Sequence, residues 1–240
     1  MSAEDMLERA INAETPRGRA YWARRGLANL GTLDRATQML LLRQLHMAYY
    51  ETRRFQQAAM VAEQAIALGV LSDVAHQDAA RAKQALSDIE GAAGHLRIAA
   101  RAGPPSRKAF HWWTLGSLYF LAGQYESSMA ALQRAVRWGT VDKPLFQGHL
   151  ALVQCAAGKA PPISELEALI GRLSRVSAGQ GYGRFVLGHL AFYAGRPDEA
   201  RKLLQAFVRR GISGRPALAL SLSGEIAMAR ATLERLATSA

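Results

Sequence analysis

The amino-acid sequence predicts an all-α fold in which antiparallel helix pairs stack on one another as an α-solenoid, a single domain over residues 1–240. Three observations favour this fold class. A motif recurs at a roughly constant interval, its small and apolar residues have helical spacing, and the composition (50% hydrophobic, 20% charged) is typical of a folded chain. A helix pair cannot bury its apolar stripe alone, so successive pairs must stack to form a continuous core.

The clearest copy of the motif is the segment 112–119, whose sequence is WWTLGSLY, and a turn follows it at Gly123. A second copy begins at Leu187, turns at Gly195 and continues in a helix that starts with proline. A third copy, over residues 42–65, has Arg53 where the others have a turn glycine. Because the segment 112–119 matches the pattern W-x-x-L-G-x-x-Y at every specified position, the chain resembles the tetratricopeptide repeat family.

The residues expected to open the second helix of each pair recur at intervals of 29 to 41 residues, around the roughly 34 residues of this repeat. Small or apolar residues follow each of them at three, seven and ten positions, which places those residues on one helix face. The alternative is an irregular bundle whose alanine-rich helices imitate a period. The predicted second helices start at Ala20, Phe55, Ile89, Tyr125, Leu166, Pro197 and Ile226.

The resemblance implies a right-handed superhelix of six to seven helix pairs, with the degenerate segment 1–37 as an N-terminal cap. The insertion Gly158–Ile163 is expected to lengthen one loop. The glycine-rich segment 179–183 lacks the preceding strand of a phosphate loop and is interpreted as a connection between repeats. The final pair has a short first helix, so its apolar face is a candidate for self-assembly.

In the family, the first helix of each pair lines a concave surface, which implies that its inward positions hold a peptide or helix of a partner protein. We expect Trp113 and Phe185 to be the main hydrophobic anchors, because Trp112 and Leu187 already take the interior positions of their helices. The alternative for each aromatic residue is packing between helices. The inward positions are Arg43, Gln44, Met47, Tyr50, Glu51, Gln77, Asp78, Arg81, Gln84, Phe110, Trp113, Thr114, Ser117, Phe120, His149, Leu152, Tyr182, Phe185, His189, Phe192 and Tyr193.

The formal net charge of +11 suits an acidic protein segment, nucleic acid or an anionic membrane surface. The arginines are scattered as pairs such as Arg24-Arg25, Arg53-Arg54 and Arg209-Arg210, and the simpler interpretation is that they lie on solvated helix faces. A protein-binding adaptor or scaffold is therefore the leading hypothesis, with Arg43 and Arg81 contacting an acidic partner. Binding of nucleic acid through arginine-rich faces is the alternative.

Enzymatic chemistry is not expected, because no catalytic motif occurs in the sequence. His149 and His189 are the candidate metal ligands, but they have no obvious third ligand, so neither a metal nor another cofactor is predicted. Cys155 lies in an apolar segment and is expected to be an inert packed thiol. The acidic start of the chain and the absence of a long apolar stretch predict a cytoplasmic protein without a membrane span.

Overall fold

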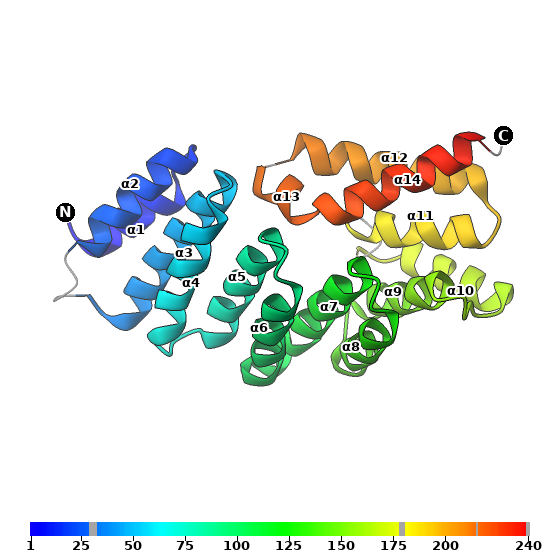
Figure 1. The fold of residues 1–240 in the computed structure, drawn as a ribbon, viewed down its shortest axis with the longest axis horizontal. Helices are drawn as coiled ribbons and strands as arrows, with labels where there is room; N and C mark the ends of the chain where they lie inside the picture. The colour runs from blue at the N-terminus through cyan, green and yellow to red at the C-terminus, as the bar shows by residue number, and fades with distance from the viewer. Residues whose placement is uncertain (29–32, 178–180, 215, 239–240) are drawn as a thin grey trace. The chain divides into compact units, whose positions relative to one another are not determined.

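The computed structural model describes residues 1–28, 33–177, 181–214 and 216–238 of the chain; Gly179 and Gln180 of the glycine-rich segment lie outside this part. All the regular structure in the described residues is helical, in a succession of 14 helices (Figure 1). The all-α prediction and the prediction of consecutive antiparallel pairs are confirmed. The helices are α1 (Ala3–Ile11), α2 (Pro16–Leu27), α3 (Arg35–Glu51), α4 (Phe55–Ala67), α5 (Ser72–Ala85), α6 (Ile89–Ala102), α7 (Pro105–Leu121), α8 (Tyr125–Trp138), α9 (Lys143–Ala156), α10 (Ile163–Ser174), α11 (Gly183–Tyr193), α12 (Pro197–Ser213), α13 (Pro216–Ser221) and α14 (Ser223–Thr238).

The starts of the second helices agree closely with the repeat pattern. Four of them, α4, α6, α8 and α12, begin at the predicted residue, whereas α2, α10 and α14 begin three or four residues earlier. In α10 and α14 the predicted residues Leu166 and Ile226 are buried, and each helix begins with exposed residues before them. In α2 this extra turn starts with Pro16 and is capped by the side chain of Thr15.

The turn between the two helices of a pair requires a left-handed residue. Gly123, Gly158 and Gly195 have φ angles of 72°, 73° and 71° at this place. Arg53 has a φ angle of 58° at the corresponding turn between α3 and α4, so an arginine does adopt the conformation that glycine adopts without steric cost. This confirms that Arg53 replaces the turn glycine.

The chain divides into two compact units, residues 1–111 (the first unit) and residues 112–240 (the second unit), with α7 running through the boundary. In the first unit each helix from α1 to α6 packs on the next (Figure 1). Small residues such as Ala10, Ala23 and Ala65 are buried between larger ones such as Met39 and Leu42. A buried ion pair joins α2 to α3, with 2.6 Å between Arg19 Nη1 and Glu51 Oε2.

In the second unit, α14 completes the stack of helix pairs by packing on α11 and α12. The pairs α8–α9, α9–α10 and α11–α12 are in contact, and α11 also packs on α9. Helix α14 lies along α12 and also contacts α11 (Figure 1). Helix α11 is therefore surrounded by α9, α10, α12 and α14, and every residue from Phe185 to Ala191 is buried.

Gly116 allows α7 and α8 to approach closely. A Cβ atom at Gly116 would lie 2.6 Å from Leu132 Cγ, whereas a Cβ atom at Gly94 in α6 would meet nothing within 4 Å. We expect Gly116→Ala to lower the free energy of unfolding by about 1–3 kcal/mol, reduced by the helix propensity of alanine. Gly94→Ala is the matched control and should raise it by about 0.5–1 kcal/mol. Thermal melting followed by circular dichroism measures both changes, and equal shifts would contradict the close approach.

Candidate functional site

The inward positions predicted from the sequence fall into two sets that differ in exposure. In α3 and α5 of the first unit, Arg43, Gln44, Met47, Gln77 and Arg81 are partly exposed. In the second unit most of the predicted positions are buried, and so is Tyr50 in the first unit. The buried ones are Tyr50 (4% exposed), Ser117 (7%), Phe120 (4%), His149 (0%), Leu152 (0%), Phe185 (0%) and His189 (1%).

Phe185 is a core residue, and its predicted role as an exposed anchor is wrong. Its ring centroid lies 5.3 Å from that of Phe207 and 4.5 Å from that of His189. The prediction assumed that a helix has one interior face, already taken by Leu187. Because four helices surround α11, Phe185 and Leu187 are both interior. Phe120 and Leu152 are likewise packed in the core, and this corrects their assignment to a partner-binding surface.

Trp113 is half-buried and contacts aromatic residues of the second unit. Its indole Nε1 donates a hydrogen bond to His149 Nδ1 at 3.0 Å, and its ring meets that of Tyr182 edge-on with 4.8 Å between centroids. Trp113 therefore stabilises the second unit through packing and a hydrogen bond. Phe110, in the first unit, is 44% exposed and is the more accessible of these two aromatic residues.

The two inward histidines form internal hydrogen bonds, and their burial disfavours the charged form. His149 accepts the hydrogen bond of Trp113, and burial lowers the pKa of His149 to about 3, with a smaller contribution from the charge of His189. His189 Nδ1 lies 2.8 Å from the carbonyl oxygen of Phe185, and its Nε2 lies 3.2 Å from Thr232 Oγ1 of α14. Burial lowers the pKa of His189 to about 4.

Glu225 of α14 places its carboxyl group beside Ser117 of α7 and Tyr182, the residue before α11. Ser117 Oγ donates to Glu225 Oε1 at 3.2 Å, and the hydroxyl of Tyr182 donates to the same oxygen at 3.3 Å. Burial raises the pKa values of both Glu225 and Tyr182. Ser117 is buried in these contacts, so its predicted role in holding a partner is also corrected, whereas Tyr182 remains partly exposed. Sequence reasoning missed Glu225, because an acid in the first turn of a helix is already explained by the helix dipole.

Five partly exposed inward positions of α3 and α5 are together called the α3–α5 face: Arg43, Gln44, Met47, Gln77 and Arg81. Arg43 Nε lies 3.1 Å from Asp78 Oδ2, and Arg81 Nη1 lies 3.4 Å from Asp78 Oδ1. The side chain of Asp78 is only 5% exposed, whereas those of Arg43 and Arg81 are 40% and 32% exposed. The face therefore carries two accessible guanidinium groups for one buried carboxylate.

A second ion-pair cluster links α5 to the part of α7 that belongs to the first unit. Arg107 donates two hydrogen bonds to Asp73, at 2.7 and 2.9 Å, and His111 lies 3.0 Å from the same carboxylate and 3.0 Å from Gln77 Oε1. Burial disfavours the charge of Asp73, but these hydrogen bonds outweigh burial and lower its pKa. The partners lie about one repeat apart in sequence, as Arg43 and Asp78 do, and that spacing is a signal by which sequence analysis could have found them.

No constellation of metal ligands or reactive thiol emerges in the part of the chain that the structure describes. There, no group of three or more His, Cys, Asp or Glu side chains is placed to hold a metal ion. Cys155 is buried, and burial raises its pKa to about 11, so the thiolate is disfavoured at neutral pH. Over the same residues, none of the helices has both the length and the apolar character needed to cross a membrane.

Serial two-helix layers joined by left-handed turns define a helical-repeat protein of the α-solenoid class. The sequence profile described as "Tetratricopeptide repeat" matches residues 78–140 and 185–237; the first match spans the boundary between the two units, and the second lies within the second unit. These two segments carry tetratricopeptide repeats, which supports the resemblance of the chain to this family. No curated protein matches it.

Two solved structures of repeat proteins from bacteria align with this chain. A tetratricopeptide repeat protein from Parabacteroides merdae ATCC 43184 aligns with a TM-score of 0.62 at 13% sequence identity, over 98% of this chain and 93% of that chain. A TPR repeats protein from Bacteroides fragilis NCTC 9343 aligns with a TM-score of 0.39 at 14% identity, over 94% of this chain and 97% of that chain. The first of these likenesses supports the fold assignment.

Proposed function

We propose that the α3–α5 face binds an acidic segment of a partner protein, in extended or helical form, so that the chain works as a non-enzymatic adaptor or scaffold. Tetratricopeptide repeats generally mediate protein–protein interactions. The α3–α5 face consists of inward positions on the first helices of two successive pairs, where the family resemblance implies ligand binding. These five predicted binding positions are partly exposed, which supports the proposal.

The observation that carries the proposal is the sharing of Asp78 by Arg43 and Arg81. A guanidinium group has five N–H donors, and the bonds to Asp78 use one from each arginine. The remaining donors suit the carboxylates of a partner, which guanidinium groups bind in bidentate geometry. Gln44 and Gln77 add amide groups that can bond a partner's backbone, and Met47 adds a flexible apolar contact.

Changing Asp78 and the two arginines should alter binding in opposite directions. Asp78→Asn removes the internal carboxylate, frees both guanidinium groups and is expected to tighten binding of an acidic peptide severalfold. The triple variant Arg43→Gln, Arg81→Gln, Asp78→Asn removes the arginines without leaving a buried carboxylate unpaired, and should weaken binding at least tenfold, as expected for the loss of about 1.4 kcal/mol or more. Fluorescence anisotropy with short peptides of equal length, bearing acidic, neutral or basic residues, measures these changes.

The matched control is Arg209→Gln, Arg210→Gln, which removes two exposed arginines of the second unit. This variant should leave peptide binding within about twofold of the unmodified chain, because screened charges outside the binding face contribute little. Equal weakening by the control and the triple variant, or a preference for basic peptides, would contradict the proposal. Circular dichroism melts of every variant separate loss of binding from loss of folding.

A further inference from the structure

A hollow of about 690 Å³ lies in the first unit, where α2 meets the C-terminal end of α3 and the turn before α4. None of its lining residues belongs to the α3–α5 face. The lining combines arginines with tyrosines and small or apolar groups, and it contains no acidic residue. The lining residues are Pro16, Arg17, Ala20, Tyr21, Arg24, Arg25, Ala48, Tyr49, Thr52 and Arg54.

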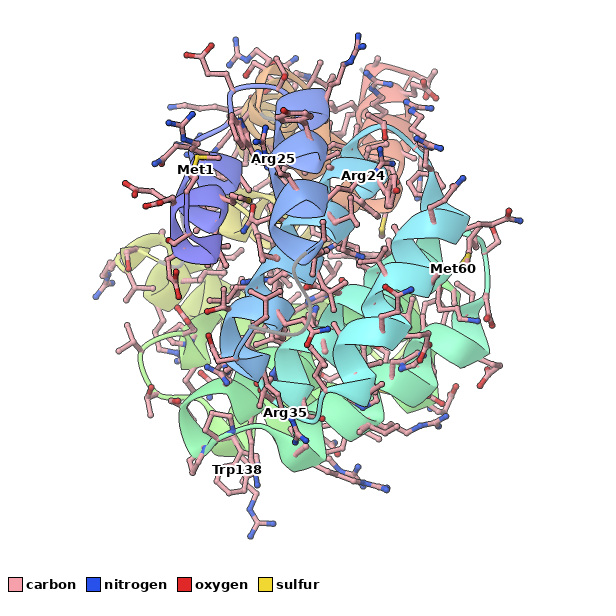
Figure 2. All side chains as sticks on the ribbon, turned by 90° about the vertical axis from the view of Figure 1, so that its left-hand side faces the viewer. Met1, Arg24, Arg25, Arg35, Met60 and Trp138 are labelled. Atoms are coloured by element: carbon pink, nitrogen blue, oxygen red, sulfur yellow. The ribbon has the colours of Figure 1, made fainter. Side chains whose placement is uncertain are left out.

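The fold brings together arginines that are scattered in the sequence. Arg24 and Arg25 occupy the last turn of α2 and lie at its surface (Figure 2), and Arg54 joins them from the turn between α3 and α4. Arg17 adds a fourth positive charge from the first turn of α2. The sequence alone favoured solvated helix faces for these pairs, because nothing in it places residues 24 and 54 beside one another.

Three of the hollow's four arginines contact tyrosines. Arg24 Nη2 donates to the hydroxyl of Tyr49 at 2.6 Å, and Arg25 Nη1 donates to the hydroxyl of Tyr21 at 2.9 Å. The guanidinium groups of Arg24 and Arg54 lie over the ring of Tyr49, at 5.5 and 5.1 Å from its centroid. Across the described ranges, no carboxylate forms an ion pair with any of the hollow's four arginines.

Arg19, also in α2, differs from the arginines of the hollow because it is buried and paired with an acid. Its side chain is buried and bonds Glu51 at 2.6 Å, whereas the arginines of the hollow are exposed and keep their charge. The dipole of α2 favours cations in its last turn, so it partly explains why Arg24 and Arg25 lie there. It does not account for Arg17 or Arg54, which lie outside that turn.

We infer that this hollow binds a nucleotide of single-stranded nucleic acid, with its phosphate held by the arginines and its base against Tyr21. Guanidinium groups bind phosphate oxygens in bidentate geometry, and exposed aromatic rings provide stacking surfaces for bases. Tyr21 is 53% exposed, and the hollow falls within the size range of small-molecule sites. A carboxylate-bearing peptide would use the arginines but would leave the aromatic and apolar lining without a partner.

The test measures binding of fluorescently labelled single-stranded RNA and DNA, each about ten nucleotides long, to the full chain by anisotropy. The variant Arg17→Gln, Arg24→Gln, Arg54→Gln removes three charges, and Arg172→Gln, Arg209→Gln, Arg210→Gln is the control of equal charge and similar exposure. We expect the first variant to bind at least tenfold more weakly and to lose roughly 2 units of the slope of log affinity against log salt, at about 0.7 per phosphate contact. The control should retain most of the affinity and the slope.

Tyr21→Ala tests stacking without changing charge and is expected to weaken binding roughly tenfold. Competition by adenosine monophosphate would identify a single nucleotide as the recognised unit, and competition by oligonucleotides alone would identify the strand; both support the inference. Absence of binding, equal loss in the control, an unchanged affinity in Tyr21→Ala, or stronger competition by an oligoglutamate peptide would overturn it. Because these variants leave the α3–α5 face intact, the outcome is independent of peptide binding there.

Discussion

Replacing Phe185 with alanine is expected to destabilise the second unit by about 3–5 kcal/mol, the usual cost of truncating a buried phenylalanine. Phe185 is fully buried, and its ring contacts those of Tyr182, His189 and Phe207. Domains are stable by only about 5–15 kcal/mol, so this loss removes much of the stability of the unit. Urea unfolding, followed by far-ultraviolet circular dichroism and by tryptophan fluorescence, measures the change.

Phe110→Ala is the matched control, because Phe110 is also an inward aromatic position but is 44% exposed. Its truncation should change the free energy of unfolding by less than about 1 kcal/mol. The alternative assignment of Phe185 as an exposed anchor makes the opposite prediction: the variant would lose binding to a partner but keep its unfolding midpoint. An unchanged midpoint in Phe185→Ala would therefore contradict the buried position.

Acid is expected to destabilise the second unit through His149 and His189. Both side chains are neutral in the folded state, with pKa values of about 3 and about 4, and titrate near 6.5 when unfolded. As the pH falls below 6.5, the unfolded chain binds protons that the folded chain does not, so the stability present above pH 6.5 is lost progressively down to about pH 4 and below. The combined loss is on the order of several kcal/mol.

Glu225 works in the opposite direction, because burial raises its pKa above the ordinary value of 4.5. The folded state holds the proton of Glu225 more tightly than the unfolded state does, so its contribution to stability falls as the pH rises above 4.5. Glu225→Gln should therefore steepen the net loss of stability in acid. It retains an oxygen that can accept the hydrogen bonds of Ser117 and Tyr182.

The histidine contribution is isolated by His149→Gln and His189→Gln, since glutamine offers a hydrogen-bond donor and acceptor but does not titrate. Urea unfolding at pH values between 7 and 4 gives the number of protons taken up on unfolding. Each substitution should reduce that number by nearly one around pH 5. At pH 4 the effect of His189→Gln should fall to about one half, because folded His189 is then partly protonated. A slope that remains unchanged in both variants would show that these histidines are not held neutral.

The starts of the second helices could be predicted from the sequence to within about one helical turn, whereas the exposure of the inward side chains could not. The segment 112–119 and the left-handed turn at Gly123 are local features, and local spacing determines them. The burial of Phe185 depends on the four helices that surround α11, and Ser117 bonds Glu225 of α14, which lies 108 residues away in the sequence. Periodicity indicates which residues share a helix face, but it does not indicate whether another helix of the same chain covers that face.

The accessible part of the predicted surface was also partly predictable. Arg43 and Arg81 were expected to be inward, and the structure leaves both partly exposed. Their shared contact with Asp78 follows the repeat, because Arg43 and Asp78 are 35 residues apart. The hollow beside Tyr49 has no such regularity: α2 and the turn before α4 occupy different positions in their helix pairs, so only the three-dimensional structure brings Arg24 and Arg54 together.

The hydrogen bond between Ser117 and Glu225 spans 108 residues and has a consequence for biosynthesis. Nearest-neighbour contacts in a repeat protein can form as soon as each pair is translated. The polar groups of α7 must instead wait until α14 has left the ribosome, roughly 5–20 s later at usual elongation rates. We therefore expect Ser117 and its apolar neighbours to stay accessible to chaperones until α14 has been synthesised.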